Sequence, residues 1–185
     1  MEAHSQLVQV EKDTLTKYAT DKMSALEIGT YMGGSANIIA KALRPEGKLY
    51  CVDPFPDRKG KKDPGWTIAE RDLKRNGIFE KVIFLRGLST DPAITSKIPK
   101  GLDFVFVDGD HSYQGLANDW NIVKECVSMG GIVCLHDTLI PPLEPYRKFG
   151  STEYFEDIVR NDPEFQLIET SYSMTILCRI ARSQP

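Results

Sequence analysis

A short strand-like run that ends in a glycine-bearing turn constrains the fold of this 185-residue chain more than any other feature. The run is Ala25-Leu26-Glu27-Ile28-Gly29, and it continues into Thr30-Tyr31-Met32-Gly33-Gly34-Ser35 and a helical stretch. Glycines between a buried strand and a helix N-terminus let backbone N–H groups approach a ligand with no Cβ in the way. The turn lacks the G-x-G-x-x-G dinucleotide pattern, because Tyr31 stands where the second glycine is required. The segment therefore predicts a ligand-binding α/β fold without the dinucleotide fingerprint.

Strand-like and helix-like segments alternate along the rest of the chain. Strands are expected at residues 25–29, 49–53, 81–85, 102–108 and 131–135, and helices at 5–18, 34–43, 66–75, 92–96, 113–129 and 152–161. Apolar strands alternating with helices indicate a parallel sheet covered on both faces. Residues 165–170 and 174–180 read as a terminal hairpin that adds one antiparallel strand. We therefore predict one domain over residues 1–185, with an N-terminal helix in 1–22 and a Rossmann-like, doubly wound, mostly parallel seven-stranded sheet.

Composition and charge argue against several classes of function. The net charge of −3 leaves no basic footprint for nucleic acid. No apolar run approaches the length that crosses a bilayer, and residues 1–20 are too polar for a secretory signal. The four cysteines lack metal-binding spacing and indicate a reducing compartment. These features predict a cytoplasmic protein without nucleic-acid or membrane partners, and they leave homo-oligomer formation open.

The second strand ends in an acidic residue followed by a basic loop. Asp53 lies about 20 residues beyond the glycine turn, where a carboxylate accepts hydrogen bonds from ribose hydroxyls in nucleotide-binding α/β folds. The alternative for Asp53 is a turn residue before Pro54. The loop Arg58-Lys59-Gly60-Lys61-Lys62 is either simply solvated or a lid that attracts an anionic ligand.

Titratable side chains gather after the fourth and fifth strands. Asp108-Gly109-Asp110-His111-Ser112-Tyr113 follows the fourth strand, and His136-Asp137-Thr138 follows the fifth. Open α/β sheets bind ligands at the carboxyl ends of their strands, and we expect these two strands to be neighbours. The oxygen and imidazole groups could hold a divalent ion such as Mg²⁺, which would fix a substrate hydroxyl and lower its pKa. The alternatives are helix capping by the aspartates and structural hydrogen bonding by the histidines.

The glycine turn resembles the first motif of class I S-adenosylmethionine-dependent methyltransferases, an acidic residue followed by G-x-x-x-G. Glu27, Gly29, Gly33 and Gly34 occupy those places, and the resemblance extends from Leu26 through Ile180. It implies S-adenosylmethionine as the cofactor, with the loop after the third strand beside the adenine. The cofactor-binding residues that it implies are Glu27, Gly29, Thr30, Tyr31, Gly33, Gly34, Ser35, Asp53, Leu88, Ser89 and Asp108.

The two strand-end clusters look like those of the small-molecule O-methyltransferase branch, which includes metal-dependent sugar and antibiotic-tailoring enzymes. This resemblance implies Asp108, His136 and Asp137 as ligands of Mg²⁺ or another divalent metal. It implies His111, Asp108 and His136 as catalytic residues, with His111 in the place of the general base. His136 stands where a carboxylate is usual, and imidazole suits Zn²⁺ or Mn²⁺ better than Mg²⁺.

The resemblance implies methyl transfer to a hydroxyl group of a small molecule, either a sugar or a secondary metabolite. Residues 139–150 are then the expected substrate loop. Two alternatives stay open: a module that binds a nucleotide-type ligand without catalysis, and an NAD-dependent oxidoreductase. The missing dinucleotide glycine pattern disfavours the oxidoreductase. The acids and histidines at the strand ends favour an enzyme over the passive module.

Overall fold

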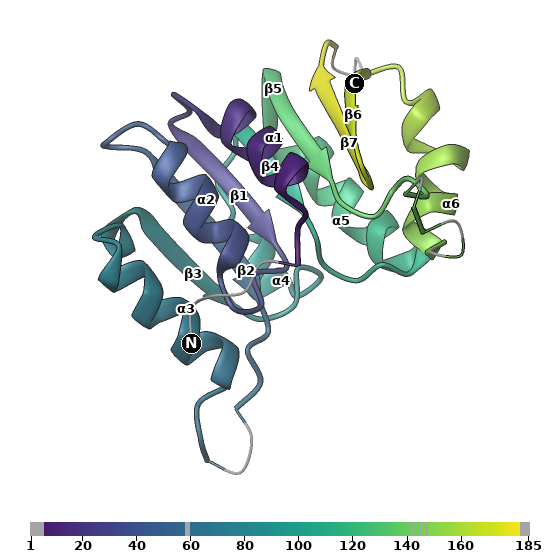
Figure 1. The fold of residues 1–185 in the computed structure, drawn as a ribbon. Coiled ribbons are helices and arrows are strands. Elements are labelled where there is room, and N and C mark those ends of the chain that lie inside the picture. The colour runs from purple at the N-terminus through teal and green to yellow at the C-terminus, as the bar shows by residue number, and fades with distance from the viewer. Residues whose placement is uncertain (1–5, 58–59, 142, 145, 147, 182–185) are drawn as a thin grey trace.

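The computed structural model describes residues 6–57, 60–141, 143–144, 146 and 148–181. A seven-stranded sheet forms its centre, in the order β3-β2-β1-β4-β5-β7-β6 (Figure 1). The strands are β1 (Ser24–Ile28), β2 (Lys48–Asp53), β3 (Val82–Arg86), β4 (Leu102–Val107), β5 (Val127–Leu135), β6 (Phe165–Ser171) and β7 (Met174–Arg179). Strand β7 pairs antiparallel with β5 and β6, and the other pairs are parallel. The predicted doubly wound, mostly parallel sheet with a C-terminal antiparallel strand is confirmed.

Helices cover both faces of the sheet (Figure 1). They are α1 (Gln9–Ala19), α2 (Gly34–Ala42), α3 (Pro64–Arg75), α4 (Pro92–Thr95), α5 (Tyr113–Cys126) and α6 (Gly150–Asp157), with short 3-10 turns at Phe79–Lys81 and Val159–Asn161. Phe104 and Phe106 of β4 belong to the apolar cluster that buries α1, α2 and α3. Val105 lies in the opposite cluster, with α4, α5 and α6. This division follows from the strand period of two, which sends successive side chains to opposite faces.

The largest differences from the expected element boundaries are in α1, at the junction of α5 and β5, and in α6. Helix α1 begins at Gln9 instead of residue 5, because Val8 is extended (φ −72°, ψ 164°). Helix α5 ends at Cys126 and β5 begins at Val127, because Val127 pairs with Leu102 before an irregularity in the β4–β5 register. The expected helix over residues 152–161 is the shorter α6 followed by a separate 3-10 turn.

The parallel strands bring their carboxyl ends to one edge of the sheet. The turn after β1, the end of β2 and the loops after β3, β4 and β5 therefore lie together, although they are distant in sequence. Strands β4 and β5 are neighbours, as expected. Within the described part of the chain, every helix is too short or too polar to serve as a membrane span.

Candidate active site

A cavity of about 550 Å³ opens at this edge of the sheet, within the range of sites that hold small molecules and cofactors. Its walls come from the glycine turn, the end of β2, the loops after β3 and β4, and helix α5. The predicted cofactor-binding residues that line it are Gly29, Thr30, Tyr31, Gly34, Ser35, Asp53, Leu88, Ser89 and Asp108. His111 lines it as well. The structure thus brings most of the predicted cofactor contacts and the predicted base into one cavity.

Two predicted cofactor contacts, Glu27 and Gly33, do not line this cavity. Glu27 is completely buried in β1, and burial raises its pKa to about 7. Gly33 precedes α2 with φ +78°, and a Cβ built there would lie 2.8 Å from the Cβ of Ala69 in α3. Both residues therefore support the turn through contacts inside the protein, Glu27 with Cys51 of β2 and Gly33 with Ala69 of α3.

Gly29 is required by the neighbouring strand. Its φ is +92°, and a Cβ at this position would lie 2.1 Å from the carbonyl oxygen of Asp108. The backbone of Asp108 also donates a hydrogen bond from N–H to the Ile28 carbonyl oxygen at 2.8 Å. The glycine thus allows the ends of β1 and β4 to meet at the cavity floor.

The Asp53 carboxylate holds the glycine turn in place. Its Oδ2 accepts hydrogen bonds from the backbone N–H groups of Thr30 (3.0 Å) and Tyr31 (2.8 Å). Its Oδ1 accepts one from the N–H of Phe55 at 2.9 Å. Since each carboxylate oxygen has two acceptor positions, Oδ1 retains one for a donor in the cavity. Asp53 therefore combines the turn role with a place in the cavity wall.

Helix α5 contributes a buried carboxylate that the sequence analysis did not single out. Asp119 lines the cavity, is 4% exposed, and accepts a hydrogen bond from the Ser89 hydroxyl to Oδ1 at 2.6 Å. Burial raises the pKa of Asp119 to about 6, against the lowering effect of the Ser89 hydrogen bond. A signal for it exists in the sequence, because Asp119 lies on the apolar stripe of Leu116 and Trp120, and a buried carboxylate needs partners.

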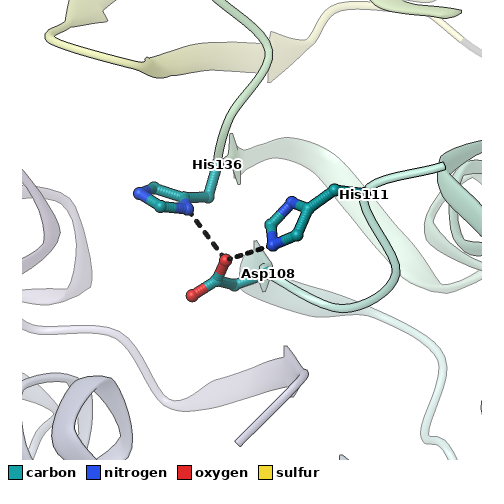
Figure 2. Close-up of side chains that lie close together, drawn as sticks. All are labelled: Asp108, His111 and His136. Atoms are coloured by element: carbon teal, nitrogen blue, oxygen red, sulfur yellow. Dashed lines mark ion pairs between the residues drawn. The ribbon is translucent and has the colours of Figure 1, made fainter. Parts of the chain in front are cut away.

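Asp108 and two histidines form the opposite end of the site. Figure 2 shows both imidazole rings beside the Asp108 carboxylate. His136 Nδ1 lies 2.8 Å from Asp108 Oδ1, and His111 Nε2 lies 3.7 Å from the same oxygen. The His111 side chain is 34% exposed, whereas His136 is buried and does not line the cavity. Only His111 is therefore open to a substrate.

Two further carboxylates surround His136. Its Nε2 lies 3.5 Å from Oε1 of Glu11 on α1, and its Nδ1 lies 3.6 Å from Asp137 Oδ2. Burial by itself would lower the pKa of His136, but the contacts with Asp108 and Glu11 and the charge of Asp137 outweigh it and raise this pKa to about 10. The three surrounding carboxylates therefore favour the protonated form of the His136 ring.

Glu11 was not predicted as a site residue. Its sequence signal resembles that of Asp119, because Leu7, Glu11 and Leu15 recur at helical spacing and would share one face of a helix. All three are buried. A carboxylate on such an apolar stripe is expected to find donors inside the protein.

The loop after β5 lies beside His111. The Phe149 ring centroid is 5.2 Å from that of His111, and the N–H of Ser151 donates to the His111 carbonyl oxygen at 2.9 Å. Residues 142, 145 and 147 of the expected substrate loop lie outside the described residues, as do Arg58 and Lys59 of the basic loop. The described loop residues Leu143 and Tyr146 are each 83% exposed.

The sheet order, the glycine turn and the strand-end cavity define a Rossmann-like α/β domain of the class I methyltransferase type. The chain belongs to the methyltransferase domain family, whose model matches residues 26–138. Comparison with curated proteins and with solved structures agrees with this assignment.

Two curated relatives are O-methyltransferases. The chain is 28% identical over 148 residues to rhamnosyl O-methyltransferase of Mycobacterium tuberculosis, covering 74% of this chain and 56% of that protein. It is 27% identical over 147 residues to caffeoyl-CoA O-methyltransferase 3 of Nicotiana tabacum, with the same coverage. The chain thus spans a little over half the length of these relatives. The O-methyltransferase TomG of Streptomyces achromogenes, solved in complex with SAM, has the same fold (TM-score 0.73, 19% identity, 95% of this chain and 82% of that chain).

Proposed function

We propose that this protein is an S-adenosylmethionine-dependent O-methyltransferase that acts on a small hydroxylated molecule, either a sugar or a secondary metabolite. The observation that carries the proposal is that one cavity has the glycine turn and Asp53 toward one end and Asp108 and His111 toward the other. Membership of the methyltransferase family supports methyl transfer. The curated O-methyltransferase relatives support a hydroxyl acceptor.

The cofactor end of the cavity fits S-adenosylmethionine. Gly34 and Ser35 line the cavity at the first turn of α2, where backbone N–H groups have no partner within the helix and suit a carboxylate. The open acceptor position on Asp53 Oδ1 suits a ribose hydroxyl. Leu88 and Ser89 in the loop after β3 would flank the adenine.

His111 is the proposed general base. The chemistry supplied by bound S-adenosylmethionine is an activated methyl group, and the attacking hydroxyl oxygen must lose its proton. His111 reaches the cavity and stands between two carboxylates, with Nε2 3.7 Å from Asp108 Oδ1 and Nδ1 3.8 Å from Asp137 Oδ2. These carboxylates would stabilise the imidazolium that forms when His111 takes the proton. His136 is a poorer candidate because it does not line the cavity and already faces Asp108.

A divalent metal fits this arrangement less well. Ligand atoms of Asp108, His111 and His136 all lie within 4.8 Å of one another, which is a suitable grouping. However, His136 Nδ1 lies 2.8 Å from Asp108 Oδ1, and a ring nitrogen that carries a proton toward that oxygen cannot ligate an ion. The expected set of Asp108, His136 and Asp137 therefore fits a metal only after His136 loses a proton. Metal assistance stays a prediction, and full activity in excess chelator would exclude it.

Binding of S-adenosylmethionine, compared with NAD, tests the proposal. Calorimetry and thermal unfolding should show that S-adenosylmethionine binds and, at a hundredfold excess over its Kd, raises the free energy of unfolding by about 2.7 kcal/mol. NAD should have no effect. Binding of NAD without S-adenosylmethionine would overturn the proposal. Methyl transfer from labelled cofactor to a panel of sugars and phenols then separates an enzyme from a passive binding module, which would bind but transfer nothing.

We also propose the remaining expectations from the sequence. They are a single domain over residues 1–185, a cytoplasmic location, the absence of nucleic-acid and membrane partners, and homo-oligomer formation as an open question. The place of Phe149 beside His111 supports residues 139–150 as the loop that contacts the acceptor.

A further inference from the structure

A buried group of hydrogen bonds fastens helix α1 to the acceptor end of the site. Glu11 is 1% exposed, and its Oε1 accepts hydrogen bonds from the Ser173 N–H (3.1 Å) and the Ser173 hydroxyl (2.7 Å). The same oxygen lies 3.5 Å from His136 Nε2. Oε2 accepts a hydrogen bond from the Val8 N–H at 3.1 Å. Glu11 therefore contacts the N-terminus of its own helix, the β6–β7 turn and His136 at once.

The donors around both oxygens of Glu11 favour its ionised carboxylate, which accepts at each oxygen. Burial alone would raise the pKa of Glu11, but the contact with His136 and the hydrogen bonds from Ser173 and Val8 outweigh it and lower this pKa. The backbone groups around both carboxylate oxygens are donors. A glutamine would direct its NH₂ group at a backbone N–H in either orientation of the amide. Glutamate satisfies the site and its neutral isostere does not.

Glu11 is linked to the cavity through His136. This ring is held with Nε2 toward Glu11 and Nδ1 toward Asp108, and Asp108 in turn lines the cavity beside His111. We propose that Glu11 is a positioning residue, which fixes the His136 ring so that Nδ1 holds the Asp108 carboxylate beside the His111 base. The inference rests on the proposed function of this site. Because Gln6 lines the cavity, α1 also connects directly to a segment of the cavity wall.

A purely structural role for Glu11 is the alternative. In that case Glu11 only caps α1 and fastens Ser173, and its loss would lower stability without affecting the His136 ring. Thr14 provides a matched control one turn later on the same helix. It is buried, and its hydroxyl lies 2.8 Å from Ser171 Oγ in a hydrogen bond to the same hairpin, with the Val10 carbonyl oxygen as its other partner and not His136. Thr14→Val removes that hydrogen bond at similar volume.

Side-chain nitrogen NMR of the histidines tests the proposal without an acceptor. The chain has three histidines, so single His→Asn variants assign their resonances. We expect Glu11→Gln to change the Nδ1 and Nε2 resonances of His136, and Thr14→Val to leave them unchanged. Unchanged His136 resonances in Glu11→Gln would overturn the proposal. If Glu11→Gln does not fold, Glu11→Asp replaces it, because this variant keeps the charge but shortens the side chain. Glu11→Asp should also change the His136 resonances, and unchanged resonances would overturn the proposal.

Kinetics provide the second readout once an acceptor is found. Glu11→Gln should lower kcat by about 10- to 100-fold, by analogy with the loss of carboxylates that orient metal-ligating histidines. The KM for S-adenosylmethionine should not change, because Glu11 does not line the cavity. Equal losses of kcat in Glu11→Gln and Thr14→Val would overturn a positioning role. A parent protein that fails to bind S-adenosylmethionine would instead refute the proposed function, and the NMR result would still stand.

Discussion

At the proposed cofactor end of the cavity, backbone groups of the glycine turn, Asp53 of β2 and Asp119 of α5 form the wall. At the proposed acceptor end, ionisable side chains from α1 and from the loops after β4 and β5 meet, and Ser173 of the β6–β7 turn donates hydrogen bonds to one of them. The first end depends on close backbone approach, as at Gly29. The second depends on the contacts of ionisable groups, as around His136, where three carboxylates surround one buried imidazole ring. The comparison indicates that substitutions at the two ends should have different effects. Changes at the cofactor end should lower stability or cofactor affinity, and changes at the acceptor end should lower turnover.

Loss of His111 should have the largest effect on activity, and this effect should be limited to turnover. His111→Ala removes the proposed base and should lower kcat by about 10²–10⁴-fold, the usual contribution of one general base. Calorimetric affinity for S-adenosylmethionine should persist, because the cofactor end is built from other residues. If the variant also loses affinity for S-adenosylmethionine, the two ends of the cavity do not have separate roles.

Gly29→Ala should be the most damaging change to the fold. The added Cβ meets the Asp108 carbonyl oxygen and the backbone has φ +92°, so we expect a loss of at least about 3 kcal/mol in the free energy of unfolding. Gly130→Ala is the matched control, because Gly130 has φ +74° but nothing within 4 Å of an added Cβ. It should cost about 1–2 kcal/mol from the backbone conformation alone. Equal costs in urea unfolding would show that contact between β1 and β4 is not the reason for Gly29.

Asp53→Ala should weaken cofactor binding by about 1.5–3 kcal/mol, the size of hydrogen bonds to a charged group. The variant also leaves the N–H groups of Thr30, Tyr31 and Phe55 without their acceptor, so the turn itself should loosen. Asp53→Asn keeps one acceptor oxygen and should lose less. Titration calorimetry with S-adenosylmethionine measures both, and unchanged affinity in Asp53→Ala would reduce Asp53 to a turn residue.

Asp119 should contribute the smallest effect, a pH dependence of stability. Its folded-state pKa of about 6 lies above the unfolded value of about 3.9. The folded protein therefore retains a proton that the unfolded chain has released between these values, and stability falls as pH rises through about 4 to 6.

Asp119→Asn removes this ionisation while keeping an acceptor for Ser89. Relative to the parent, the variant should gain roughly 1–2 kcal/mol between pH 4 and pH 7, less than the full shift because surroundings relax around a buried charge. Denaturant unfolding at several pH values measures this difference. A parallel pH profile in parent and variant would show that Asp119 does not titrate in this window.

Patterns along the chain were enough to predict the seven strands from β1 to β7, the glycine turn and the two strand-end loops. They depend on neighbours in sequence: strand periodicity, glycine at a turn, acids after an apolar run. The boundary between α5 and β5 was misplaced because it is set by pairing of Val127 with Leu102, a long-range contact. The sequence likewise could not show why position 29 requires glycine, because the reason is the close approach of the Asp108 backbone.

The sequence by itself thus determined the fold class, and it predicted the edge of the sheet where the cavity lies and three of the residues that line it, Asp53, Asp108 and His111. Only the tertiary structure decided how those residues are partnered. Glu11 and Asp119 are carboxylates on apolar helix stripes, and the sequence indicates that they need partners without saying which. Folding places Glu11 against His136 and Ser173, and Asp119 against Ser89. The physical reason is that a buried charge is stabilised by groups close in space, and those groups come from segments far apart in the chain.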